Sequence, residues 1–313
     1  MGSLKDRSHR ILITGASGQY GRLTVDKLLE RSTPPSSLLL VTRDPSKLEV
    51  YAARGAVVRQ GSFDDSVDEL AEAFSGAGVM LFIATARAGQ RLPQHRAAID
   101  AAVLAGVSHI VYTSIVGAHL EQPTALVAQE HRATELMLQS SGVAWTALRD
   151  SQYAEALSDV AAGPAIQSGW LRSNSQHGGI ALISRNDCVA AAAAVLADPA
   201  GHRNRSYEIT GPELLTWEDV ANLIGAAAGT KVQYQALSDD EQYALFDEMG
   251  IPRHAIDDVV VQGYPWNSSD MVSFGKATRL GEMSSISTDV ELLTGVKPKK
   301  FHEILGQRLQ IAH

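Results

Sequence analysis

Three glycines near the N-terminus, Gly15, Gly18 and Gly21, have the spacing of a loop that binds a diphosphate. They follow an apolar run at residues 10–14 and precede apolar residues at roughly helical spacing. Such a turn lets the backbone approach a diphosphate and points free amide groups of a helix N-terminus at it. The position of the glycines after the first apolar run predicts a dinucleotide site, the alternative being an ordinary strand–turn–helix corner.

The end of the next apolar run indicates which dinucleotide this is. Residues 38–42 are followed by Arg43, and Lys47 comes about one helical turn later. An acidic residue at this place bonds the ribose 2′-hydroxyl of NAD, whereas a guanidinium matches a 2′-phosphate. Asp44 is predicted to cap the next helix, with Pro45 at its first position. The pattern favours NADP(H), unless Arg43 is only a solvated surface charge.

An alternation of strand-like and helix-like segments positions these residues. The strand-like segments are apolar runs, typical of parallel strands buried on both faces, at residues 10–14, 38–42, 57–58, 79–83, 109–113 and 145–149. Helix-like segments separate most of them, at residues 45–54, 66–74, 92–105 and 128–140. Gly106 and Gly142 stand where helix C-terminal glycines are expected. The alternation predicts an α/β fold with a Rossmann-like, doubly wound parallel sheet.

The regular pattern ends near residue 149, which suggests a second, smaller unit. We expect residues 1–150 to form an NADP-binding Rossmann domain to which 185–210 return. Residues 151–184 and 211–313 are expected to form a smaller α/β domain that covers the substrate. Within it, Thr216 is predicted to cap a helix, with Asp219 completing the capping box. An aromatic group at residues 264–266 either walls an apolar pocket or belongs to the core.

Composition excludes several classes of function. The formal net charge of −8 and the lack of a basic run argue against a nucleic-acid partner. The single cysteine, Cys188, excludes a disulfide framework, and no metal site is expected because the ten histidines are scattered. No apolar run reaches membrane-spanning length, and the N-terminus has no signal-peptide core. We therefore expect a cytoplasmic protein.

Several strings resemble the NmrA-like branch of the atypical short-chain dehydrogenases/reductases, and most of all its NADPH-dependent type-2 quinone oxidoreductases. The resemblance covers most of the chain up to about residue 260. The string at residues 89–96 is more specific than the glycines. The others lie at residues 15–21, 41–47, 112–114, 130–135, 148–155 and 207–211.

The resemblance implies a Rossmann domain with NADPH across the ends of the strands, and it implies roles for individual residues. Ser17, Gln19 and Tyr20 would line the diphosphate, and Arg43 would hold the 2′-phosphate. Ser62 and Phe63 would lie beside the adenine, and Ala84 and Thr85 beside the ribose. Gln90 and Tyr153 would lie beside the nicotinamide.

The chain departs from the family in its acid–base residues. Familiar members of the wider family use a tyrosine followed four residues later by a lysine, and none of the eight tyrosines has that lysine. Asp150 stands where relatives often have asparagine, and Gln152 stands where an aromatic residue is common. Both changes fall beside the expected substrate pocket, so the substrates of relatives do not transfer directly.

Hydride transfer to a quinone or an activated imine depends mainly on proximity and orientation, so reduction remains possible without that pair. His131 is a candidate acid or base because histidine titrates near neutrality, although a structural role is equally expected. Asp150 is a further acid–base candidate. Tyr153 and Ser114 are candidates for orienting the substrate, or they only line the pocket.

Three hypotheses follow. The first is an NADPH-dependent reductase of a quinone, enone, imine or similar apolar small molecule. The second is a regulator that senses NADP(H) without turnover, which the missing tyrosine–lysine pair would explain. The third is a biosynthetic enzyme that retains the cofactor for a rearrangement or cyclisation, which the altered residues Asp150 and Gln152 would explain.

Overall fold

Seven parallel strands form the central sheet of the protein. The computed structural model describes residues 10–89, 91–256 and 266–311. The strands lie in the order β3-β2-β1-β4-β5-β6-β9. The chain adds β2 and β3 on one side of β1 and the later strands on the other side, so the order of strand addition reverses between β1 and β4. Their bounds are β1 (Arg10–Ile13), β2 (Leu38–Thr42), β3 (Val57–Gln60), β4 (Ala77–Phe82), β5 (His109–Ile115), β6 (Ala144–Asp150) and β9 (Arg205–Ile209). This confirms the predicted Rossmann-like sheet, whose ligands bind beyond the strand C-terminal ends at such a reversal.

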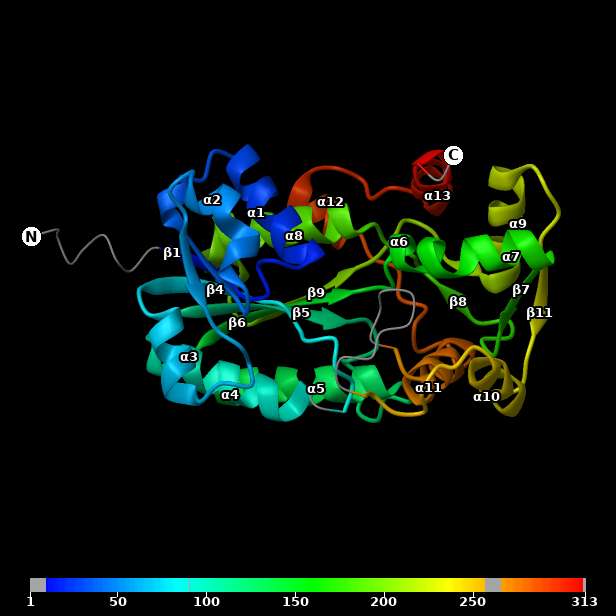
Figure 1. Ribbon diagram of the computed structural model, residues 1–313, viewed down its shortest axis with the longest axis horizontal. Coiled ribbons are helices and arrows are strands. Elements are labelled where there is room, and N and C mark those ends of the chain that lie inside the picture. The colour runs from blue at the N-terminus through cyan, green and yellow to red at the C-terminus, as the bar shows by residue number, and fades with distance from the viewer. Residues whose placement is uncertain (1–9, 90, 257–265, 312–313) are drawn as a thin grey trace, which may run out of the picture.

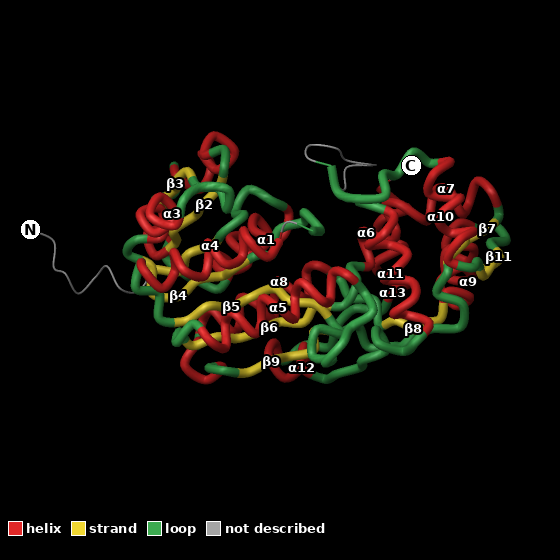
Figure 2. The backbone as a smooth tube through the Cα atoms, turned by 90° about the horizontal axis from the view of Figure 1, so that it is seen from below, coloured by secondary structure: helices red, strands yellow, loops and turns green. Residues whose placement is uncertain are grey.

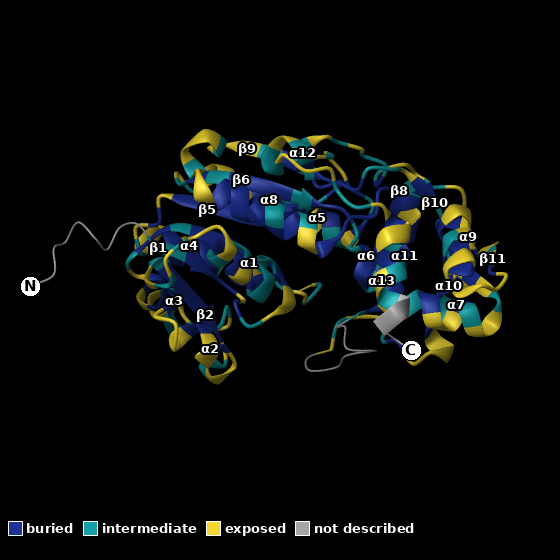
Figure 3. Cartoon of the chain, turned by 90° about the horizontal axis from the view of Figure 1, so that it is seen from above, coloured by how far each residue is buried: buried dark blue, intermediate teal, exposed yellow. Residues whose placement is uncertain are grey.

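Helices cover both faces of the sheet (Figure 1). One face carries α1 (Gln19–Glu30), α8 (Arg185–Ala197) and α12 (Asp289–Thr294), and the other carries α3 (Val67–Phe74), α4 (Arg91–Leu104) and α5 (Leu126–Ser140). Each layer packs its own apolar cluster against the sheet. The sheet strands and inner helix faces are accordingly buried, and the outer helix faces are exposed (Figure 3).

Local signals explain where the helices begin and end. The side chain of Asp44 accepts from the amide of Ser46, and Thr216 and Asp219 form a capping box, as predicted. Gly106 and Gly142 follow α4 and α5 with φ of 77° and 79°, values that favour glycine. The helix expected at 45–54 is instead a 3₁₀ turn (η3, Pro45–Leu48) and a short α2 (Glu49–Ala52). Leu48 ends η3 and is the N-cap of α2, and its φ of −120° and ψ of 13° lie outside the helical region.

The rest of the chain forms a smaller part beyond the strand C-terminal ends (Figure 2). Two strand pairs lie in it, β7 (Trp170–Ser173) with β11 (Gln233–Ala236) and β8 (Gly179–Ile180) with β10 (Leu215–Thr216). Its helical elements are α6 (Ala154–Leu157), η4 (Ser158–Ala162), α7 (Gly163–Ser168), α9 (Trp217–Ala228), α10 (Asp239–Glu248), α11 (Ser268–Arg279) and α13 (Phe301–Ile311). The short turns η2 (Pro35–Ser37) and η5 (Pro199–His202) connect elements of the larger part.

We propose the division into a Rossmann domain and a smaller covering domain, with one amendment. Strand β9 pairs with β6, and α8 packs on α1, so residues 185–210 lie with the large sheet. Helix α12 also packs against α8 and β9, with Val290 in the same apolar cluster. We therefore assign α12 to the Rossmann domain, although the sequence placed it in the smaller one.

Candidate active site

The glycine loop connects β1 to α1 and has the geometry that close approach of a dinucleotide needs. Gly15 has a φ of 57°, which favours glycine at this turn. A Cβ atom on Gly21 would lie 2.5 Å from the carbonyl oxygen of Gly15, so only glycine lets α1 pack this closely on the loop. Gly18 is the N-cap of α1, which has no side-chain cap and no acidic residue in its first turn. This uncapped helix N-terminus fits a diphosphate.

Hydrogen bonds hold the glycine loop against the end of β2. The hydroxyl groups of Ser17 and Thr42 are 2.7 Å apart. The guanidinium of Arg22 donates to the carbonyl oxygens of Ser17, at 2.9 Å, and Lys47, at 2.6 Å. Arg43 and Lys47 are exposed beside this junction, and the ammonium of Lys47 lies 3.7 Å from the carboxylate of Asp44. Sequence reasoning missed Arg22, although a basic residue directly after the last glycine was a signal for it.

The other residues expected around the cofactor lie at neighbouring strand ends. Ser62 and Phe63 follow β3, and Phe63 packs edge-on against Phe82 at 5.4 Å between ring centroids. Ala84 and Thr85 follow β4, where the amide of Ala84 donates to Thr113 Oγ1. Gln19 begins α1. Gln90 lies outside the described residues.

A cavity of about 830 Å³ opens beyond the C-terminal ends of β4, β5 and β6. The smaller part of the molecule supplies its opposite wall, mainly from η4, α7, β7, α10 and α11. Seven residues expected from sequence line it together, namely Tyr20, Ala84, Thr85, Ser114, His131, Asp150 and Tyr153. Trp266 of the aromatic group lines it as well, whereas Tyr264 and Pro265 lie outside the described residues.

Asp150 and Tyr153 form the group in this cavity that is best suited to move a proton. The hydroxyl of Tyr153 donates to Asp150 Oδ2 at 2.8 Å, and Asp150 is 3% exposed. Burial raises the pKa of Asp150 to about 7, although the hydroxyl of Tyr153 and the thiol of Cys188 oppose the shift. The guanidinium of Arg185 lies 5.0 Å from the centre of the Tyr153 ring. A carboxyl group with this pKa can give up a proton near neutral pH.

His131 is buried, and its surroundings shift its pKa. Burial and the nearby charge of Arg91 lower its pKa well below the usual value, and it is 6% exposed. Its Nδ1 shares a hydrogen bond of 2.8 Å with the hydroxyl of Tyr112. A pKa lowered in this direction favours the neutral ring, which fits the structural alternative. A part for His131 in catalysis stays a prediction.

Ser114 is held in a buried network of charges. Its hydroxyl donates to Glu135 Oε1 at 2.6 Å, and Glu135 pairs with Arg149 at 2.7 Å. Arg149 also pairs with Glu208 at 3.1 Å. With its proton engaged, Ser114 can only accept a hydrogen bond from a ligand in the cavity.

The segment after β4 is fixed by partners from α4 and α5. The amide of Thr85 donates to His95 Nε2 at 3.2 Å, and its carbonyl accepts from Arg91 Nε at 2.7 Å. Arg91 pairs in turn with Glu130 at 2.6 Å, and Glu130 also accepts from the amide of Gly89.

Tyr20 is buried, with its hydroxyl bonded to the carbonyl of Cys188, so only its backbone is available to a diphosphate.

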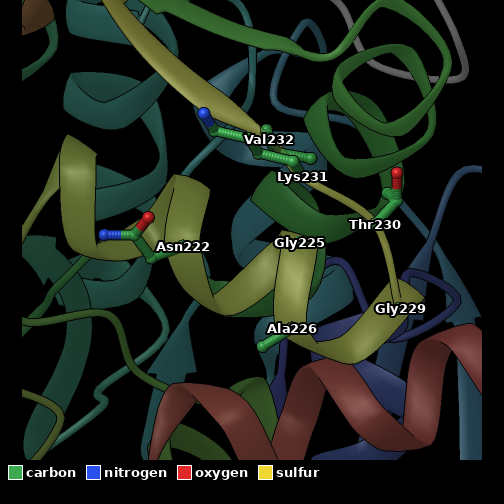
Figure 4. Close-up of a pocket in the computed structure, with 7 residues that line it drawn as sticks. All are labelled: Asn222, Gly225, Ala226, Gly229, Thr230, Lys231 and Val232. Atoms are coloured by element: carbon green, nitrogen blue, oxygen red, sulfur yellow. The ribbon is translucent and has the colours of Figure 1, made fainter.

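A second hollow, of about 450 Å³, lies at the C-terminal end of α9 (Figure 4). Three of the seven residues that line it are glycine or alanine, and Lys231 is the one charged residue among them. It contains none of the residues expected to do chemistry.

Within the described ranges, no three His, Cys, Asp or Glu side chains gather as a metal site, and no helix is long and apolar enough to cross a membrane.

Comparison with known proteins gives consistent matches. A family model described as NAD(P)H-binding matches residues 15–199. Quinone oxidoreductase 2 of Escherichia coli (strain K12) is 37% identical over 243 residues, which cover 77% of this chain and 82% of that protein. NAD(P)H azoreductase of Xenophilus azovorans is 29% identical over 247 residues, which cover 79% of this chain and 84% of that protein. The crystal structure of the E. coli NADPH-dependent quinone oxidoreductase QOR2 complexed with NADPH has a TM-score of 0.85 and 31% identity, covering 96% of this chain and 99% of that one.

Proposed function

Because the chain belongs to the NAD(P)H-binding family of NmrA-like oxidoreductases, we propose that it reduces a quinone, enone, imine or similar apolar electrophile with NADPH. The enzyme class and the cofactor follow from the family, whereas the chemical class of the electrophile is our proposal. The cavity carries this proposal, since it brings Asp150 and Tyr153 to the strand ends where a dinucleotide of this fold ends. No tyrosine–lysine pair of the usual spacing takes part.

Bound NADPH supplies the hydride in such a reaction. The glycine loop and the N-terminus of α1 would hold the diphosphate, and Arg43 and Lys47 would hold the 2′-phosphate. Much of the cavity lining is apolar, which gives an apolar electrophile a surface to pack against. Asp150 gives its proton to the oxygen or nitrogen of the electrophile as that atom gains negative charge. Tyr153 orients the carboxyl group of Asp150, and solvent then returns the proton to it.

The function is tested by incubating the pure protein with NADPH and a panel of quinones, enones, imines and azo compounds. Loss of the absorbance of the reduced cofactor, with a matching amount of reduced product, is the expected result. Tight NADPH binding without turnover on any acceptor would contradict the proposal and favour a cofactor-sensing regulator. A product formed without net oxidation of NADPH would favour the rearrangement enzyme.

Arg43→Ala should weaken NADPH binding by about tenfold to a hundredfold, since charge-assisted hydrogen bonds to the 2′-phosphate are lost. NADH lacks this phosphate, so its affinity should change little. Equilibrium dissociation constants for both cofactors, measured by calorimetry, give the comparison. Arg54→Ala removes an exposed arginine outside this junction and serves as the control. An equal loss of affinity for NADPH and NADH would show that Arg43 does not read the 2′-phosphate.

A further inference from the structure

Several residues that line the main cavity have a buried polar atom without a hydrogen-bond partner among the described residues. Of the eight buried side-chain polar atoms without a hydrogen-bond partner in the described part of the chain, four belong to residues that line it: Thr85 Oγ1, Asp150 Oδ1, Gln152 Oε1 and Trp217 Nε1. Buried polar atoms are normally paired, because leaving one unpaired costs free energy. Their concentration in one cavity indicates that a ligand is their partner.

Trp217 is the most specific of the four. Its indole nitrogen can only donate a hydrogen bond, so the unpaired group calls for an acceptor atom on the ligand. The side chain is 7% exposed and packs in the apolar cluster of the smaller part with Leu157 and Leu171. The capping box of Thr216 and Asp219 fixes the first turn of α9, which begins at Trp217. The orientation of the donor is thus set by the fold before any ligand binds.

The unpaired atoms come from both parts of the molecule. Asp150 ends β6 of the large sheet, whereas Trp217 begins α9 in the smaller part (Figure 1). Apolar side chains from helices of the smaller part, among them Leu157, Phe246 and Phe274, line the same cavity. Its volume of about 830 Å³ lies near the upper end of the range for small-molecule sites. The nicotinamide end of NADPH is expected to fill the part of this space beside Ala84, Thr85 and Tyr153. A substrate that was only a single small ring next to it would leave the indole N–H of Trp217 without a partner.

We propose that the substrate is an elongated molecule with an electrophilic end at Asp150 and Tyr153, an apolar body, and a hydrogen-bond acceptor that pairs with the indole N–H of Trp217. This inference rests on the reductase function proposed above and specifies the class of its substrate. Trp217 is then a residue that determines specificity at a distance from the reacting bond.

The first test uses three quinones with the same ring: para-benzoquinone, an alkyl-tailed derivative, and the same derivative with a terminal ketone on its tail. We expect kcat/KM to rise with the alkyl tail and again with the ketone. Trp217→Phe should lower the ratio of the ketone-tailed to the alkyl-tailed substrate by about threefold to tenfold, the range for one neutral hydrogen bond. Trp170→Phe makes the same change at an exposed position of the cavity and should keep that ratio.

The second test needs no turnover and no stable Trp217 variant. The indole N–H signals of the four tryptophans are followed by NMR, and Trp217 is assigned by elimination with Phe variants of the other three. With NADP⁺ bound, the ketone-tailed quinone should shift the Trp217 N–H downfield, and the alkyl-tailed quinone should not.

The outcomes separate the two proposals. Reduction of all three quinones with equal kcat/KM, or an equal effect of both tryptophan variants, would overturn the inference and leave the reductase function intact. An unchanged Trp217 signal with the ketone-tailed quinone bound would overturn it too. Oxidation of NADPH by none of the three, despite saturable binding of the tailed quinones, would contradict the proposed function instead.

Discussion

Asp150→Asn is expected to lower kcat/KM for NADPH-dependent reduction by about a hundredfold, because the amide cannot give up the proton that the substrate gains. The substitution preserves the size of the side chain and its ability to accept from Tyr153 at the 2.8 Å position. The affinity for NADPH should therefore stay close to that of the wild type. Stopped-flow measurement of the hydride-transfer step, together with the dissociation constant for NADPH, separates the two effects.

The pH dependence of the reduction rate is a second test of whether Asp150 gives the proton. Burial raises the pKa of Asp150 to about 7, so the carboxyl group carries its proton below that pH and loses it above. The rate of the wild-type protein should fall as the pH rises through about 7, and Asp150→Asn should lack this limb. Tyr153→Phe removes a hydrogen bond that lowers the pKa of Asp150, so its limb should move to higher pH. A limb that persists unchanged in Asp150→Asn would assign the proton to another group.

The free energy of unfolding should also depend on pH through the ionisation of Asp150, and it should fall as the pH rises. The pKa of Asp150 is about 7 in the folded protein and 3.8 as the ordinary value, so between these pH values the folded state binds more protons than the unfolded state. Burying the neutral carboxyl group is favourable relative to burying the charged one, and this stability is lost as the pH rises from about 4 to about 7. Asp150→Asn avoids the loss, so its stability relative to the wild type should increase between about pH 4 and about pH 7, by on the order of a few kcal/mol. Urea unfolding at several pH values tests this, and a stability difference independent of pH would contradict the raised pKa.

The sequence predicted the sheet because local signals and tertiary structure agree there. Strands buried on both faces appear as unbroken apolar runs such as residues 38–42, and Asp44 and Thr216 are caps that need only neighbouring residues. The glycine loop was equally visible, since a positive φ at Gly15 and close packing at Gly21 both demand glycine.

The remaining features of the site depend on contacts between distant segments. The pKa of His131 is lowered because α5 packs it against Tyr112 of β5 and near Arg91 of α4, and no local sequence pattern predicts that burial. The same holds for Asp150, whose raised pKa comes from burial alone. The far wall of the cavity comes from α10 and α11, where the sequence mixes helical pieces with glycine, proline and serine. Trp217 was visible only as part of a helix start.

Gly21→Ala is the substitution expected to affect cofactor binding most. The new Cβ would lie 2.5 Å from the carbonyl oxygen of Gly15 and 2.7 Å from the Cα of Ala16. Both are backbone atoms of the turn, so α1 must move away from the loop instead of a side chain moving aside. We expect a loss of about 1–3 kcal/mol in the free energy of unfolding from this overpacking. NADPH affinity should fall by about a hundredfold, as expected when one or two backbone hydrogen bonds to a charged diphosphate are lost.

Two other glycines separate this steric effect from the general effect of replacing glycine. Gly306→Ala in α13 adds a Cβ with nothing within 4 Å, so it should leave NADPH affinity unchanged and stabilise the helix by up to about 1 kcal/mol. Gly18→Ala places its Cβ 3.2 Å from the carbonyl oxygen of Gly15, and its effect on affinity should be intermediate. Calorimetric titration with NADPH and thermal unfolding of the three variants establish the order. If Gly21→Ala bound NADPH as tightly as Gly306→Ala, the packing of α1 on this loop would not be what holds the diphosphate, and the cofactor would have to rely on Arg43 and the strand ends.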